Sequence, residues 1–172
     1  LLFRDKIIEV STFRSEESAG FNNVFGSIDE DVRRRDFTAN ALFLNPEDNT
    51  VVDYVGGVKD IRDRVLRPVI PLKRIFVEDP VRMIRACKYS VTGSLKIPWM
   101  VRRRIRRDRP LLADTASSRM TEEVFKILNT GHAAGIVGML LEYGLLGGMV
   151  PEVAALAERN SGFRKALLDR LG

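Results

Sequence analysis

The sequence predicts an α+β fold, in which a β-containing N-terminal part is followed by an all-helical C-terminal part. A β-branched, apolar stretch at residues 6–13 indicates a strand. Apolar segments at 41–44 and 51–54 flank the turn-forming sequence Asn-Pro-Glu-Asp-Asn-Thr and predict a hairpin. From Val58 onward the composition is typical of helices separated by Pro and Gly. We place the boundary between the two parts at residue 70.

The N-terminal part, residues 1–70, is expected to contain few and short elements. Residues 1–13 predict one strand or two short ones, and the Ser-, Asn- and Gly-rich residues 14–28 predict a loop. Asp36–Asn40 can open a helical turn ahead of the hairpin. Gly56-Gly57 ends the hairpin and predicts a flexible junction, because glycine accepts backbone conformations that other residues avoid.

The helical part, residues 71–172, is divided by its Pro and Gly residues. The clearest helix begins at Glu78-Asp79-Pro80, with Asp79 as N-cap and Pro80 at the first helical position. Pro98 and Pro110 bracket a short, arginine-rich helix. Further helices are expected at 58–65 (just ahead of the boundary), 117–129, 132–145 and 151–171.

Composition limits the possible functions. The 172 residues suffice for one domain or two small ones, and 30% charged with 45% hydrophobic residues is typical of a folded protein. The net charge of +5 favours a polyanionic partner such as nucleic acid or a nucleotide. One cysteine, Cys87, and one histidine exclude a zinc site of His and Cys ligands, and the lone cysteine fits a reducing cytoplasm. No apolar run approaches the ~20 residues of a membrane span.

Arginines 33–35 precede Asp36 and the apolar Phe37. Guanidinium groups suit phosphate oxygens, and Asp36 could accept from a ribose hydroxyl or hold a metal-bound group, with Arg35 keeping it ionised. We expect Phe37 in the core, where it would fix the direction of its charged neighbours. For an isolated Arg-Arg-Asp motif, a surface salt-bridge cluster is an equal alternative.

Asp79, Arg82, Arg85 and Lys88 recur every three residues and therefore form one oblique ridge along the predicted helix. The acceptor of Asp79 and the donors of Arg82 could together read the hydrogen-bonding edge of a base, leaving the other cations for phosphate. The plainer alternative is an N-cap followed by a solvated cationic stripe.

Two further features could bind ligands. Glu9 lies on one strand face, where a carboxylate can complete a Mg²⁺ site, although a strand glutamate more often points at water. The dense basic run at 102–109 predicts contacts with a phosphate backbone, with a solvated helix as the alternative. Trp99 could stack on a base, but is more readily explained as a packing anchor. The expected RNA-binding residues are Arg102, Arg103, Arg106 and Arg107.

Four segments in order, "IIEVSTFR", "FGSIDEDVRRRDFTANAL", "VVDYVGGVKDI" and "EDPVRMIRACKY", resemble motifs of the class II nucleotidyltransferases, the bacterial poly(A) polymerases and CCA-adding enzymes. The resemblance continues through "SSRMTEEVFKIL" and "LLEYGLLGGMVPEV", to about residue 155. The motif sequences are more similar to those of the poly(A) polymerase branch than to those of the CCA-adding branch. It implies that residues 1–70 are the C-terminal portion of a palm domain and that residues 71–172 are a helical neck and body.

The resemblance also implies roles for individual residues. Arg35 and Asp36 would contact the sugar and triphosphate of the incoming nucleotide, with Asp36 and Glu9 among the catalytic carboxylates and Glu9 as a Mg²⁺ ligand. Asp79 and Arg82 would read the base. The remaining nucleotide-binding residues would be Arg85 and Lys88, the latter standing where the family usually has Arg.

The expected reaction is transfer of AMP from ATP to the 3′ hydroxyl of an RNA, with Mg²⁺ and without a nucleic-acid template. The family's glycine-rich loop and Asp-x-Asp metal pair lie upstream of "IIEV", so we expect this chain to be a fragment that is inactive alone. Two alternatives remain: a CCA-adding enzyme that uses CTP as well as ATP, and a non-catalytic basic RNA-binding module. An Asp-x-Asp just upstream of Leu1 would argue against the second.

Overall fold

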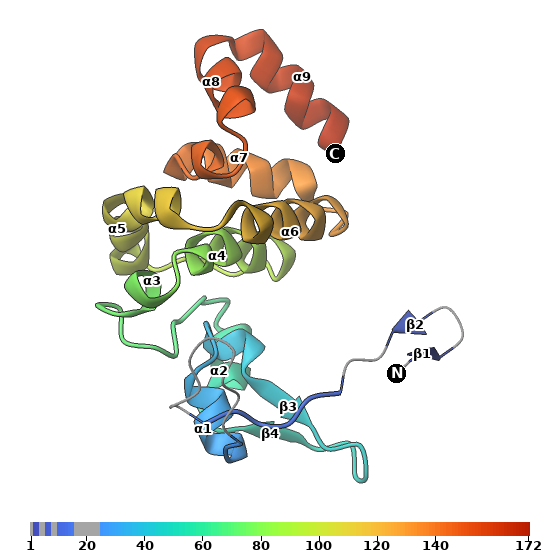
Figure 1. Ribbon diagram of the computed structural model, residues 1–172. Coiled ribbons are helices and arrows are strands. Elements are labelled where there is room, and N and C mark those ends of the chain that lie inside the picture. Colours follow the sequence, from blue (N-terminus) through green and yellow to red (C-terminus); the bar gives the residue numbers. More distant parts are fainter. Residues whose placement is uncertain (1, 4–5, 8–9, 16–24) are drawn as a thin grey trace.

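The computed structural model describes residues 2–3, 6–7, 10–15 and 25–172 (Figure 1). Near its N-terminus, β1 (Leu2–Phe3) pairs antiparallel with β2 (Lys6–Ile7). This matches the expectation of two short strands, but residues 10–13 are not in a strand. Glu9, the predicted metal ligand, lies outside the described residues.

The predicted hairpin is confirmed. Strands β3 (Leu42–Leu44) and β4 (Val51–Asp53) pair antiparallel, with Phe43 opposite Val52. At the end of β4 the Asp53 carboxylate accepts hydrogen bonds from the backbone N–H groups of residues 55–58, at 2.8–3.1 Å. These bonds fix the tight turn into α2 (Gly57–Arg62), so the two glycines form a well-defined junction.

Helix α1 (Ile28–Arg33) was not predicted as a helix. Its first turn is stabilised by a capping box, in which Ser27 Oγ accepts from the Glu30 N–H and the Glu30 carboxylate accepts from the Ser27 N–H. The pattern Ser-x-x-Glu is a known signal for the start of a helix and can be recognised in the sequence alone. The expected helical turn at 36–40 is the 3₁₀ helix η1 (Thr38–Asn40).

The C-terminal part is helical throughout, and Figure 1 shows its helices stacked away from the hairpin, with α8 and α9 at the far end. In order, the elements are α3 (Ile75–Glu78), α4 (Val81–Thr92), α5 (Trp99–Asp108), η2 (Arg109–Asp114), α6 (Ser117–Leu128), α7 (Ala133–Tyr143), η3 (Leu146–Gly148), α8 (Pro151–Arg159) and α9 (Ser161–Leu171).

Two helix predictions were wrong in detail. Helix α4 begins at Val81, one residue later than expected, although the Asp79 carboxylate still accepts from the Val81 N–H at 3.2 Å. The single helix expected at 151–171 is two helices, α8 and α9, because Asn160 leaves helical geometry and its side chain caps α9 by accepting from the Phe163 N–H. Asn160 therefore acts as a helix stop and start, which is a common use of asparagine.

One continuous hydrophobic core joins the two parts of the chain. Phe37 is completely buried, as predicted, and its ring meets that of Tyr89 on α4 edge to face at 6.1 Å. Leu66 and Ile70 extend the same core toward the helices. Within the described residues, no helix combines the length and the apolar character needed to cross a membrane.

Candidate nucleotide and RNA site

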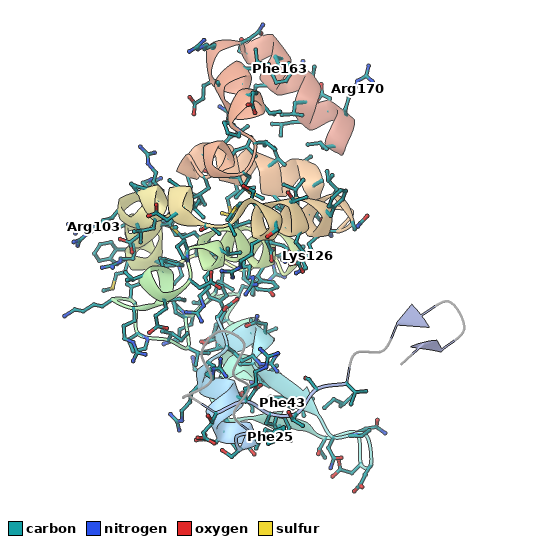
Figure 2. All side chains as sticks on the ribbon, in the orientation of Figure 1. Phe25, Phe43, Arg103, Lys126, Phe163 and Arg170 are labelled. Atoms are coloured by element: carbon teal, nitrogen blue, oxygen red, sulfur yellow. The ribbon has the colours of Figure 1, made fainter. Side chains whose placement is uncertain are left out.

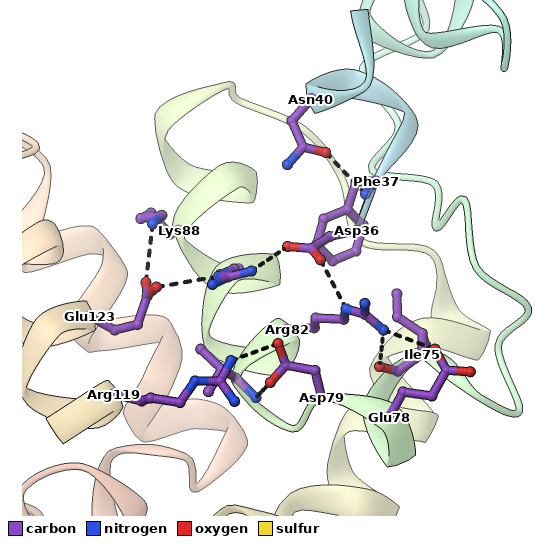
Figure 3. Close-up of polar contacts among 12 residues, drawn as sticks. Asp36, Phe37, Asn40, Ile75, Glu78, Asp79, Arg82, Lys88, Arg119 and Glu123 are labelled. Carbon is purple, nitrogen blue, oxygen red and sulfur yellow. Dashed lines mark hydrogen bonds and ion pairs between the residues drawn. The ribbon is translucent and has the colours of Figure 1, made fainter. Parts of the chain in front are cut away.

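Asp36 lies between the N-terminal part and α4. The segment 36–38 is held against residues 67–69 by backbone hydrogen bonds, from the Thr38 N–H to the Arg67 carbonyl at 2.9 Å and from the Val69 N–H to the Asp36 carbonyl at 3.2 Å. With the neighbouring Phe37 ring in the core, the Asp36 side chain is directed at α4 (Figure 3). Its direction is thus fixed by main-chain bonds and packing together.

Two arginines of the predicted ridge bind Asp36. Arg82 Nε donates to Asp36 Oδ1 at 2.9 Å, and Arg85 Nη1 donates to Asp36 Oδ2 at 3.1 Å. Asp36 is 7% exposed, so this is a desolvated carboxylate with both oxygens occupied. A buried carboxylate is tolerated only when it is paired in this way.

The ridge continues to α6 through a residue that the sequence did not single out. Glu123, 2% exposed, accepts from Arg85 Nε at 3.3 Å and from Lys88 Nζ at 3.1 Å. On the other side, Arg82 Nη1 donates to the Ile75 carbonyl at 3.1 Å and to Glu78 at 3.3 Å, and Glu78 also binds Arg74. We call this alternating series the ion-pair chain: Arg74, Glu78, Arg82, Asp36, Arg85, Glu123 and Lys88.

The ion-pair chain favours the charged forms of Glu123 and Arg85. Burial alone would raise the pKa of Glu123, but the charge and hydrogen bond of Lys88, with the charges of Arg85 and Lys126, hold that pKa below its ordinary value. Burial likewise disfavours the charged form of Arg85, but Asp36 and Glu123 raise the pKa of its guanidinium above the usual range. The ridge is therefore an ordered set of fixed charges.

Asp79 lies beside the ion-pair chain but outside it. Its Oδ2 accepts from Arg119 Nη2 of α6 at 2.8 Å, while its Oδ1 is bound to the start of α4. Figure 3 shows Asp79 and Arg82 close together with no bond between their side chains. Both members of the predicted base-reading pair are thus held in place by other residues.

Arg35 does not join Asp36. Its guanidinium donates to Asp31 on α1 at 2.9 Å and lies 5.2 Å from the centre of the Phe43 ring. The expectation that Arg35 pairs with Asp36 is therefore wrong in this structure: Arg35 lies in the turn that ends α1 and bonds back to that helix, and Arg82 and Arg85 take its place at Asp36.

A cavity of about 820 Å³ adjoins the ion-pair chain. Arg82 forms part of its wall, and the rest comes from the end of α1, η1, the turn before α2, the residues after α2 and the residues around α3. Its charged lining consists of five arginines and one glutamate: Arg33, Arg34, Arg67, Arg74, Arg82 and Glu78. A strongly positive hollow of this size is suited to a polyanionic ligand of nucleotide dimensions.

Asp60 is a further residue whose position the sequence did not reveal. It is buried in α2 and accepts from Thr38 Oγ1 at 2.7 Å and from Arg67 Nε at 3.0 Å. Both partners line the cavity. Its partners are 22 and 7 residues away, so no local pattern marks it.

The basic run forms α5, whose arginines point to two sides. Arg106 lies over the Tyr143 ring of α7, at 5.2 Å, and 3.8 Å from Glu142. Arg103 and Arg107 are exposed and, within the part of the chain that the structure describes, form no salt bridge. Trp99 is 62% exposed, so the interpretation as a packing anchor is wrong.

The predicted Mg²⁺ site, with Glu9 as one ligand and the main ligands upstream of this chain, lies outside the described residues. None of their carboxylate, His or Cys side chains gather in threes as metal ligands, and both oxygens of Asp36 are bound by arginines. Since Glu9 lies outside these residues, the Mg²⁺ assignment stays a prediction that rests on the resemblance.

The fold defines the class: a nucleotidyltransferase fragment followed by a helical body. The CCA-adding enzyme of Bacillus stearothermophilus, solved in complex with CTP, matches 78% of this chain with 33% of its own, at 36% identity and a TM-score of 0.66. A tRNA nucleotidyltransferase solved with a primer tRNA and an incoming ATP analogue matches 75% of this chain with 40% of its own, at 29% identity and a TM-score of 0.65.

Sequence comparison identifies the family. Residues 1–67 match the poly A polymerase head domain, and residues 95–156 match the probable RNA and SrmB-binding site of polymerase A. Poly(A) polymerase I of Haemophilus influenzae is 33% identical over 98% of this chain and 41% of its own length, and that of Escherichia coli O157:H7 is 35% identical over 93% and 38%. The CCA-adding enzyme of Geobacillus stearothermophilus is 34% identical over 84% of this chain and 37% of its own.

The chain therefore belongs to the family of bacterial poly(A) polymerases and CCA-adding enzymes. It spans about two fifths of the length of these curated relatives.

Proposed function

We propose that the protein is a template-independent RNA 3′-end nucleotidyltransferase that adds AMP from ATP to RNA 3′ hydroxyls. The observation that carries the proposal is the ion-pair chain, which fixes Asp36 and the ridge of α4 beside the arginine-lined cavity. Fixed positive charge next to a base-sized polar surface is what a nucleoside triphosphate requires.

In this proposal the triphosphate enters the cavity and is held by its arginines. Arg82 is shared between the cavity wall and the ridge, so a bound nucleotide would meet it between phosphate and base. Arg82 Nη2 makes no hydrogen bond to a described residue and is free to donate to a base.

Base choice is assigned to Asp79 and Arg82. Arg119 holds the Asp79 carboxylate, and Asp36 with Glu78 hold Arg82, so an acceptor and a donor are presented in a fixed relation. Fixed polar groups discriminate well between bases, since a wrong base leaves them unpaired. Arg85 and Lys88 would support the same surface through Glu123.

A CCA-adding enzyme is the second candidate, because relatives and solved structures of that activity match the chain at similar identity. Such an enzyme would use CTP as well as ATP. Mg²⁺ is proposed for either activity, since phosphoryl transfer commonly relies on metal ions that bridge the phosphates.

The experiment assays the full-length protein with each of the four nucleoside triphosphates on a generic RNA and on a tRNA lacking its CCA end. ATP-only extension of both RNAs supports the proposal. Ordered use of CTP and ATP on the tRNA alone would assign the CCA-adding activity. RNA binding with no incorporation of any nucleotide in the presence of Mg²⁺ would point to the non-catalytic module.

Base choice has its own test. Asp79→Ala should relax the preference for ATP more than it weakens triphosphate binding, because it removes an acceptor at the base and no cation from the cavity. Asp63→Ala, in an exposed pair with Lys59, is the control and should keep the wild-type preference. Unchanged nucleotide selectivity in Asp79→Ala would show that Asp79 does not contact the base and serves only to stabilise the start of α4.

A further inference from the structure

An exposed aromatic platform lies on α5. Trp99 and Met100 begin the helix and are 62% and 52% exposed, although both are large and apolar. They line a hollow of about 530 Å³ together with Pro71, Leu72 and Lys73 of the segment before α3. An indole left in solvent beside an apolar hollow is unusual for a residue that serves only to pack.

The same face of α5 carries cations. Arg103 and Arg107 follow Trp99 by four and eight residues, which places them on its side of the helix, and both line the hollow together with Arg104. Arg104 is occupied by Asp108 and by the Lys73 carbonyl. Arg103 and Arg107, one turn apart, have no acidic partner among the described residues, and Figure 2 shows Arg103 at the outer edge of the molecule.

We infer that this hollow is a subsite for single-stranded RNA, in which one unpaired base stacks on Trp99 while neighbouring phosphates bind Arg103 and Arg107. The inference rests on the proposed RNA 3′-end activity and adds to it a base contact within the RNA-binding part. An exposed indole combined with unpaired arginines is the pattern of proteins that hold single strands without reading sequence. A duplex would not fit, because its bases are already stacked on one another.

Charge favours RNA over a protein partner as occupant. The described lining has four cationic side chains, Lys73, Arg103, Arg104 and Arg107, and no acidic one. Only Arg104 is neutralised by a neighbouring carboxylate, that of Asp108. A linear polyanion with flat apolar bases complements both properties of the hollow at once.

Trp99 is the only tryptophan of the 172 residues, and comparison with Trp99→Phe isolates its contribution to the fluorescence of the full-length protein. Titration of the full-length protein with a 12-nucleotide oligo(A) should quench its fluorescence. The same length of abasic RNA should bind more weakly and quench little, and ATP at saturating concentration should leave the signal unchanged. RNA binding measured by anisotropy without any change of tryptophan fluorescence would overturn the inference.

Two variants separate stacking from charge. Trp99→Ala should weaken oligo(A) binding about 5- to 150-fold, the range found when one base–aromatic stack is lost, while Trp99→Phe should recover much of it. Phe125→Ala is the matched control, because Phe125 on α6 is 61% exposed and outside the hollow. Equal affinities of Trp99→Ala and Phe125→Ala for oligo(A) would overturn the RNA subsite. A protein partner would then be the candidate occupant of the hollow.

Arg103→Gln and Arg107→Gln should each lower the slope of log affinity against log salt by about 0.7, the value for one phosphate contact on a single strand. Arg170→Gln, on α9 at the far end of the helical part, is the control (Figure 2). An unchanged slope in both α5 variants would overturn the phosphate contacts.

Failure of the subsite and failure of the proposed function can be told apart. If Trp99→Ala binds oligo(A) like wild type and the protein still incorporates AMP, only the subsite is wrong. If the protein incorporates no nucleotide but oligo(A) quenches Trp99 as described, the subsite stands and the proposed activity is wrong.

Discussion

Asp36 and Glu123 are buried carboxylates that each lie between two cations of α4, and they make the ridge a connected unit. Each bond between neighbours in such a series polarises the next, so replacements are expected to be non-additive. The charges of Arg85 and Asp36 were recognised from the sequence, whereas their pairing was not, because they are separated by 49 residues. Glu123 was missed for the same reason, since its partners lie 35 and 38 residues away.

Asp36→Asn keeps the size of the side chain but leaves Arg82 and Arg85 without their shared countercharge. We expect a loss of about 3–5 kcal/mol in the free energy of unfolding, the scale for breaking a buried ion pair from one side. We also expect turnover of the full-length protein to fall by roughly 10²-fold. Urea unfolding and initial rates measure the two effects.

The control for this variant is Asp63→Asn, whose exposed pair with Lys59 should be worth under about 0.5 kcal/mol. Normal turnover in a folded Asp36→Asn protein would contradict the placement of Asp36 at the nucleotide site.

Glu123 should make the free energy of unfolding depend on pH in the acidic range. Its pKa in the folded state lies below the ordinary value of 4.5, so the unfolded chain binds a proton more readily. The stability it contributes is fully present above about pH 4.5, its unfolded value, and is lost as the pH falls through the lower folded value. Glu123→Gln should therefore be less stable than wild type at neutral pH, and the difference should shrink below pH ~4.

Urea unfolding of both proteins between about pH 7 and pH 3 checks this expectation. Glu152→Gln, on the exposed surface of α8, controls for the loss of one negative charge. Parallel pH profiles of wild type and Glu123→Gln would show that Lys88 and Arg85 do not stabilise the ionised form.

At the scale of elements, local signals located most of the helices and the hairpin. The turn sequence between β3 and β4 and the prolines before α4 and α5 act on neighbouring residues, so the sequence alone reveals them. The capping box of α1 is equally local and was overlooked. The break between α8 and α9 depends on the capping Asn160, whose effect inside an amphipathic pattern is harder to anticipate.

The junction between β4 and α2 requires glycine for a reason of space. A Cβ on Gly57 would lie 2.2 Å from the carbonyl oxygen of Thr38, a backbone atom that cannot move aside cheaply. We expect Gly57→Ala to lower the free energy of unfolding by about 2 kcal/mol or more, and to disturb the Thr38–Asp60 contact at the cavity. Thermal unfolding and triphosphate binding measure the two effects.

Gly138→Ala, inside α7 with no heavy atom within 4 Å of the added Cβ, is the matched control. Its free energy of unfolding should rise by about 0.5–1 kcal/mol, because alanine is the better helix former. An unchanged free energy of unfolding in Gly57→Ala would show that η1 and α2 can move apart without destabilising the fold.

At the scale of the molecule, the hydrophobic core crosses the boundary that we predicted at residue 70. Phe37 belongs to the N-terminal part, yet it packs with Tyr89 on α4 and shares one core with the helices. The sequence indicated a change of composition at this point, which locates a change of architecture. It carries no information about whether the two sides share a core, since that depends on contacts between distant residues.

Phe37→Ala should therefore destabilise the helices as well as the N-terminal part. We expect a loss of about 3–5 kcal/mol in the free energy of unfolding, with far-ultraviolet circular dichroism and Trp99 fluorescence shifting together in urea. Phe125→Ala, on the surface, should stay within about 0.5 kcal/mol of wild type. An unchanged helical transition in Phe37→Ala would mean that the helices fold independently.

The ion-pair chain also bears on attempts to exchange nucleotide preference between related proteins. Its members come from three segments: the residues between α1 and η1, the α3–α4 region, and α6. No single segment therefore contains the whole ion-pair chain. A chimera that receives α4 alone would bring Arg82, Arg85 and Lys88 without Asp36 and Glu123, and its arginines would repel one another in a foreign setting. Transplanting the preference should require all three segments, chosen as a set that balances its own charges.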